Sequence, residues 1–87
     1  MTKEWIKVGQ YVSSLRSAID LLVIQVSTIT PRGDLYLDVI DLCEGLSNLE
    51  DYLKTGRLLV LSDTKDSLLD LSIRFAKLQT QTYYLLP

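Results

Sequence analysis

Apolar residues recur along the first third of the chain at alternating spacings of three and four residues, which is typical of one face of a helix. The pattern begins at Trp5 and continues without a break to Ile29. Thr2 precedes it, and threonine often caps a helix N-terminus through its side-chain oxygen. The sequence therefore predicts a helix over residues 3–29. Its apolar positions are Trp5, Val8, Val12, Leu15, Ile19, Leu22, Val26 and Ile29.

A second pattern of the same kind runs from Leu35 to Leu53. Thr30 followed by Pro31 is a common helix start, because the first turn of a helix needs no N–H from proline. Gly56 supplies a stop signal at the other end. We therefore expect a helix over residues 31–54, which a short turn returns antiparallel to the first. Its apolar positions are Leu35, Val39, Leu42, Leu46, Leu49 and Leu53.

A third, weaker pattern includes two threonines among its apolar positions. Asp63 is a candidate cap, so we expect a helix over residues 62–84, with residues 57–61 forming a connector or a short extra turn. Together the three patterns predict an all-α antiparallel three-helix bundle with leucine-rich seams, as a single domain over residues 1–87. The third seam consists of Leu61, Thr64, Leu68, Leu71, Phe75, Leu78, Thr82 and Leu85.

An alternative replaces parts of these helices by two strands, over residues 23–30 and 58–61. The first segment is rich in β-branched residues and the second is a short apolar run between turn signals, as strands often are. A two-stranded sheet alone is only marginally stable. Since Leu22, Val26 and Ile29 continue the register set by the earlier positions, the pattern favours the helix.

Composition argues against catalysis. The chain has 87 residues, is 47% hydrophobic and contains no histidine. Cys43 is the single cysteine, and without an imidazole base nothing in the sequence would activate its thiol. We interpret it as a small apolar side chain beside the second seam. The sequence also lacks nucleotide and metal motifs, so we expect no enzyme activity, no bound metal and no cofactor.

Charge and hydropathy limit the partners. The nine basic residues are scattered and the net charge is −2, which does not provide the basic surface that nucleic acids require. No continuous apolar run reaches the roughly 18 to 20 residues of a membrane-spanning helix, because Asp20 interrupts the richest stretch. The first residues do not resemble a secretion signal. We expect a cytoplasmic protein that binds neither nucleic acid nor a membrane, and the sequence leaves open whether it is a whole protein or an excised domain.

Acidic residues are concentrated in the second helix. Residues 31–54 contain six acids and two basic residues, a sum of −4. Asp34, Asp38 and Asp41 follow the spacing of one helix face, directed away from the seam. Such a face would attract a basic protein surface, and the alternative is an ordinary solvated surface.

The chain has more apolar residues than its seams can hold. Positions that flank the seams explain Tyr11, Ala18, Val23, Tyr36 and Cys43 as buried residues. Others fall outside and form short stripes, where burial against a partner would contribute roughly 1.5 to 3 kcal/mol per side chain. With the acidic face included, the candidate partner-binding residues are Ile6, Leu21, Ile24, Leu37, Ile40, Leu69, Ile73, Tyr83, Tyr84, Asp34, Asp38 and Asp41.

These features predict a non-enzymatic protein–protein interaction module. It would self-associate, at least as a dimer, or dock a partner helix through the apolar stripes. The alternative is an acidic inhibitor or immunity-type protein whose second helix covers a basic toxin or nuclease surface. The two differ in salt dependence, because apolar association survives high salt whereas charge steering weakens.

Overall fold

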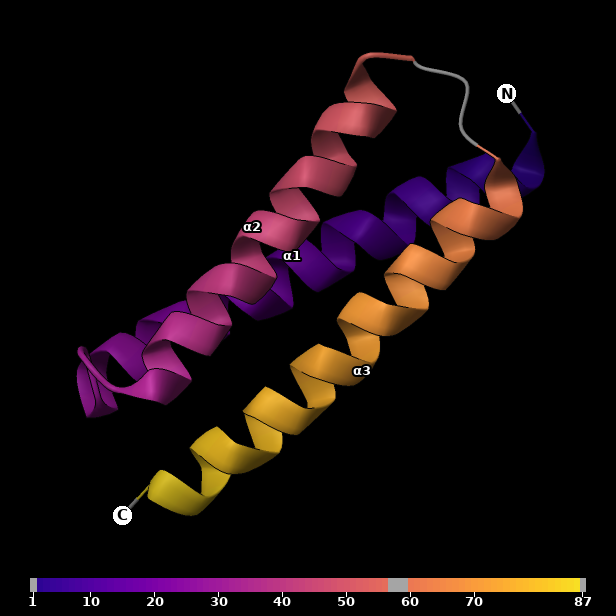
Figure 1. Cartoon of the computed structure of the whole chain (residues 1–87). Helices are drawn as coiled ribbons and strands as arrows, with labels where there is room; N and C mark the ends of the chain where they lie inside the picture. The colour runs from indigo at the N-terminus through magenta and orange to yellow at the C-terminus, as the bar shows by residue number, and fades with distance from the viewer. Residues whose placement is uncertain (1, 57–59, 87) are drawn as a thin grey trace.

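The structure, a computed structural model, describes residues 2–56 and 60–86. It contains α1 (Lys3–Ile29), α2 (Asp34–Lys54) and α3 (Leu61–Leu85), with no strand among the described residues. Figure 1 shows α1 and α2 as an antiparallel hairpin, while α3 runs in the direction of α1. The predicted all-α three-helix bundle is confirmed. The strand alternative is wrong over residues 23–30, which contain no strand and are helical as far as Ile29. In its second part, 58–61, residues 58 and 59 lie outside the described residues, Val60 is in no strand and Leu61 is helical.

The predicted start of α1 is correct. The Trp5 N–H donates to the side-chain oxygen of Thr2 at 3.4 Å, so Thr2 is the N-cap. At the other end, the Thr30 N–H donates to the Val26 carbonyl at 2.8 Å and closes the helix. The helix therefore ends at Ile29, as the periodicity predicts.

The predicted start of α2 at residue 31 is wrong, because α2 begins at Asp34 with Gly33 as its N-cap. The Gly33 N–H donates to the Thr30 carbonyl at 3.4 Å, which makes Thr30 to Gly33 a turn with Pro31 at its second position. Proline is common at that position because its φ is fixed near the value that the turn requires, and the same fixed φ suits the first turn of a helix. A Cβ on Gly33 would lie 2.4 Å from the Thr30 Oγ1, so glycine permits the close approach.

The third helix begins slightly earlier than expected, at Leu61 with Val60 as its N-cap. Asp63 does not cap it but lies in its first turn, where a carboxylate is stabilised by the positive end of the helix dipole. Gly56, just after α2, has a positive φ of 63°, which glycine adopts readily at a helix end. The expected extra turn at 57–61 falls mainly on residues outside the described part, and its last residue, Leu61, is already helical.

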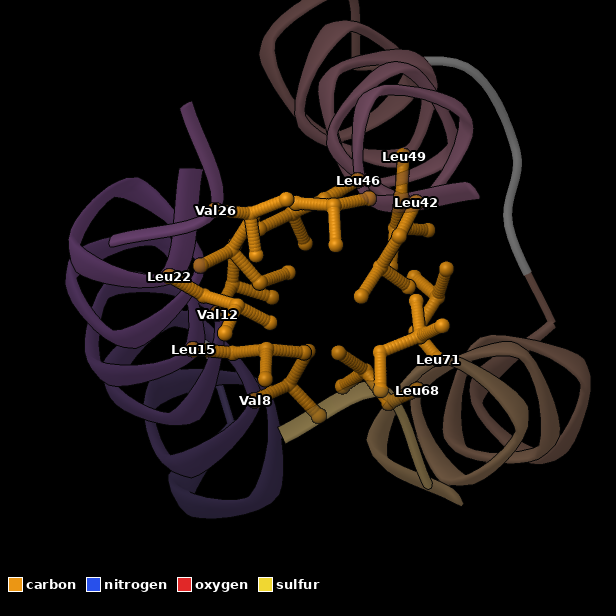
Figure 2. Close-up of a cluster of buried hydrophobic side chains, with 13 residues drawn as sticks. Val8, Val12, Leu15, Leu22, Val26, Leu42, Leu46, Leu49, Leu68 and Leu71 are labelled. Atoms are coloured by element: carbon orange, nitrogen blue, oxygen red, sulfur yellow. The ribbon is translucent and has the colours of Figure 1, made fainter. Parts of the chain in front are cut away.

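One core lies along the axis of the bundle, and Figure 2 shows its side chains pointing inward from all three helices. Thr64 and Thr82 are buried with it, as their positions in the seam predict. Their hydroxyls donate to the carbonyls of Val60 and Leu78, four residues earlier, at 3.1 and 2.8 Å, which satisfies the polar groups inside the core. The buried apolar residues are Val8, Val12, Leu15, Ile19, Leu22, Val26, Val39, Leu42, Leu46, Leu49, Leu68, Leu71 and Leu78.

Seam positions toward the helix ends are less buried than their pattern suggests. Trp5, Leu35, Leu53 and Leu61 are partly buried against the core. Leu85, predicted as a seam position, is exposed, because it lies beyond the last buried residue of α3 in the final helical turn.

The length and composition of α1 alone would suffice for a membrane-spanning helix, a property that core helices of soluble proteins share. Arg16 and Asp20 interrupt the apolar residues of α1, as expected, but the mean hydropathy of the helix remains high despite them. The absence of membrane binding stays a prediction. In the structure, six apolar residues of α1 are buried in the bundle core.

Candidate interaction surface

A polar network joins α1 to α2 along one edge of the bundle. Arg16 of α1 donates from Nε to both carboxylate oxygens of Glu50 at 3.2 Å. One terminal nitrogen of its guanidinium donates to Ser47 Oγ at 2.7 Å and to Glu50, while the other donates to Cys43 Sγ at 3.1 Å and to Asp20 at 3.5 Å. Every nitrogen of the guanidinium therefore has a partner within the protein.

The electrostatics of this network keep both central groups charged. The side chains of Arg16 and Glu50 retain only 23% and 26% of their exposure. The hydrogen bond from Arg16 lowers the pKa of the Glu50 carboxyl, against the opposing effect of burial. The same bond raises the pKa of the Arg16 guanidinium. We interpret the network as a clamp that fixes α1 against α2, since it leaves no guanidinium nitrogen free for a ligand.

The sequence contains a signal for this network that the periodicity of apolar residues alone does not reveal. An antiparallel hairpin that turns at residues 30–33 places residue 16 opposite residue 47. Cys43, Ser47 and Glu50 have the spacing of one helix edge beside the seam. A basic residue at one such flanking position and an acidic residue at the facing one form ion pairs across helix interfaces.

The predicted acidic residues lie along the edge between α2 and α3. Asp34, Asp38 and Asp41 are all exposed, as expected. Asp38 and Asp41, however, line a shallow groove together with Arg74 and Lys77 of α3. The neighbouring helix thus brings positive charge to this face, although Arg74 also pairs with Asp70 of its own helix at 4.0 Å.

The third edge, between α1 and α3, carries an apolar groove of about 420 Å³. Tyr11 of α1 is 48% exposed, which corrects its prediction as a buried flanking residue. Its ring lines the groove instead, and its hydroxyl shares a 2.6 Å hydrogen bond with the Ser72 hydroxyl of α3. The lining residues are Glu4, Lys7, Val8, Tyr11, Lys65, Leu68, Leu69 and Ser72.

Beyond the groove, this edge continues as two rows of side chains, which we call the α1–α3 face. Each row advances by three and four residues in alternation, so each follows one side of its helix. Neither row contains a charged residue over these ranges, whereas one helical turn earlier the same two sides carry Lys7 and Lys65 at the groove. The row on α1 is Tyr11, Ser14, Ala18, Leu21, Gln25 and Thr28, and the row on α3 is Leu69, Ser72, Ala76, Gln79 and Tyr83, with Leu86 following as the C-cap of the helix.

Only part of the predicted apolar set falls in these two rows. Leu21, Leu69 and Tyr83 belong to the α1–α3 face, with exposures of 58%, 60% and 72%. Ile73, one turn after Leu69, lies at its outer border and is also exposed.

The remaining apolar candidates are dispersed. Ile6 and Ile24 lie on the outer side of α1, Leu37 on that of α2 and Tyr84 on that of α3, all exposed. Ile40 was predicted to be exposed but is half-buried. It precedes Cys43 by one helical turn and so lies on the edge of α2 that packs against α1.

Comparisons with known proteins provide no functional relative. No protein family, curated protein or solved structure shows significant similarity to the chain. Over residues 2–56 and 60–86, no group of three or more histidine, cysteine, aspartate or glutamate side chains could hold a metal ion. Function must therefore be inferred from the surface.

Proposed function

We propose that the protein is an interaction module that binds another protein chain through the α1–α3 face. The observation that carries this proposal is the uncharged stretch of both rows, over residues 11–28 and 69–86, which is bounded at one end by Lys7 and Lys65 of the groove. Cores of protein–protein interfaces are depleted in charged residues and enriched in aromatic ones. Tyr11 and Tyr83 supply exposed aromatic rings on this face.

The remaining residues of the face also suit a docked helix. Leu21 and Leu69 expose more than half of their surface, and burying such side chains is favourable by roughly 1.5 to 3 kcal/mol each. Ala18 and Ala76 are small, so a partner backbone can approach closely. Serine and glutamine side chains can exchange water for hydrogen bonds at a smaller desolvation cost than charged groups.

The other two edges are less suited to this role. The edge between α1 and α2 is closed by the hydrogen bonds of Arg16. The edge between α2 and α3 carries charges of both signs, including Asp38, Arg74 and Lys77. The inhibitor hypothesis depends on a strongly acidic second helix and stays a prediction. Arg74 and Lys77 make it the less favoured one, because their positive charge weakens the electric field that would attract a basic surface.

Photo-cross-linking in the cells that make the protein tests the proposal. A benzophenone amino acid replaces Leu21 on the α1–α3 face or, as a matched control, Leu37, which is similarly exposed on α2. We expect a protein cross-link at position 21 and none at position 37. Equal labelling at the two positions, or none at position 21, would contradict binding through this face.

A further inference from the structure

The row of α3 on the α1–α3 face is evenly spaced about Ala76. Leu69 and Tyr83 lie the same number of residues, two helical turns, before and after Ala76. If two α3 helices cross antiparallel at Ala76, Tyr83 of one copy lies opposite Leu69 of the other. A two-fold axis repeats this contact at both ends, as a closed dimer requires.

The groove beside Leu69 has the chemistry that a tyrosine needs. Its floor contains Val8 and Leu68 from the core edge, and its rim carries Lys7 and Lys65. Tyrosine combines an apolar ring with a polar tip, so it favours sites with an apolar interior and polar groups at the mouth. An open groove of about 420 Å³ admits a phenol ring, and Tyr83 is 72% exposed in the single chain.

Charge selects the antiparallel arrangement. The first turns of α1 and α3 lie at the same end of the bundle (Figure 1), and Lys7 and Lys65, each four residues after its helix start, line the groove there together with Glu4. Two copies packed in parallel would place these four ammonium groups together with only the two Glu4 carboxylates to offset them, which is unfavourable. Antiparallel copies would place them at opposite ends of the interface, with only uncharged rows between them.

The long side of the bundle is large enough for a stable dimer. The bundle measures 45 × 19 × 17 Å, so a second copy that covered one long side in full would cover at most roughly 800 Å² per chain, the area of a standard stable interface. Ala76 at the crossing point lets the two α3 backbones approach closely.

We infer that the partner of the α1–α3 face is a second copy of this chain, in an antiparallel two-fold dimer in which Tyr83 of each copy occupies the groove of the other. This inference rests on the proposed function and specifies its partner and register.

Sedimentation of the purified full chain over a dilution series tests the dimer. We expect wild type to sediment as a dimer at high micromolar concentration. Leu69→Lys should weaken the dimer about tenfold or more, and Tyr83→Ala should also weaken it. Leu37→Lys makes the same change at a similarly exposed leucine outside the face and should leave the dimer intact. A monomeric wild type, or equal effects of the two lysine variants, would overturn the inference.

Disulfide mapping tests the register, in a Cys43→Ser background that retains an acceptor for Arg16. Since Ala76 lies on the proposed axis, the Ala76→Cys variant should cross-link to a second copy of itself. A mixture of Leu69→Cys and Tyr83→Cys chains should form the mixed disulfide in preference to either self-pair. A predominant pair between two Tyr83→Cys chains would indicate parallel packing and overturn the proposed register.

The two proposals fail in different ways. A cross-link from position 21 to a different protein, together with a monomeric chain in sedimentation, would overturn the dimer and leave the proposed function intact. A monomeric chain without any cross-link at position 21 would overturn both.

Discussion

Arg16 of α1 and Glu50 of α2 form an ion pair across the first helix interface, with the arginine Nε equidistant from both carboxylate oxygens at 3.2 Å. Three quarters of each side chain is withdrawn from water. A charge in such a place is unfavourable without its partner, because the lost hydration is not replaced. The pair therefore fixes how α2 lies against α1, more than the apolar seam alone would.

Replacing either member of this pair should destabilise the fold. Arg16→Ala leaves the Glu50 carboxylate partly buried without its main donor, and we expect a loss of about 2 kcal/mol in the free energy of unfolding. Glu50→Ala should have a similar effect. In urea denaturation the double variant should lose clearly less than the sum of the single variants, because the interaction is removed only once. Additive losses would show that the two side chains act independently.

The same pair makes stability depend on pH. The folded protein holds the pKa of Glu50 below its usual range, whereas the unfolded chain has a value of about 4.3. The stabilising contribution is therefore complete above the unfolded pKa and is lost as pH falls through the folded pKa. We expect the stability difference between wild type and Glu50→Gln to shrink below about pH 4. Glu44→Gln, at an exposed carboxylate of the same helix, serves as the control.

Helix faces were predictable from the sequence because burial leaves a periodic trace along the chain. The position of Leu22 in the first seam and the capping role of Thr2 both follow from local spacing, and the structure confirms them. Thr30 and Pro31 were misread because the same residues suit a helix start and a tight turn. The hydrogen bond from the Gly33 N–H to the Thr30 carbonyl shows that these residues form the turn. The local sequence does not reveal this hydrogen bond.

The flanks of the seams were less predictable, since their burial depends on which side each neighbouring helix occupies. Tyr11 was predicted to flank its seam and Ile40 to lie outside the flanks, yet Ile40 is half-buried toward α1 whereas Tyr11 lies exposed over the groove. Likewise, Arg74 lies beside the acids of α2 only because α3 packs on that side. Each uncharged row can be found in the sequence alone. That the two rows form one face follows only from the structure, in which α1 lies next to α3.

A charge in the core should unfold the domain. Leu22 is 2% exposed, so Leu22→Asp would place an unpaired carboxylate among apolar side chains, where desolvation costs several kcal/mol. Asp41→Asn alters an exposed residue of α2 and should change the stability by less than about 0.5 kcal/mol. Circular dichroism on heating compares the two variants. A similar melting temperature for both would show that the assignment of buried and exposed faces is wrong.

The stability of the turn between α1 and α2 should depend on the close contact of Gly33 with the Thr30 side chain. Gly33→Ala adds a Cβ that would lie 2.4 Å from the Thr30 Oγ1, so one of the two residues must move. We expect a loss of about 1 kcal/mol in the free energy of unfolding, the central value for single substitutions. Thr30→Ala removes the clashing oxygen, and the double variant should recover most of the loss caused by Gly33→Ala. If Gly33→Ala is equally destabilising in both backgrounds, the cost arises from the backbone of residue 33 and not from this contact.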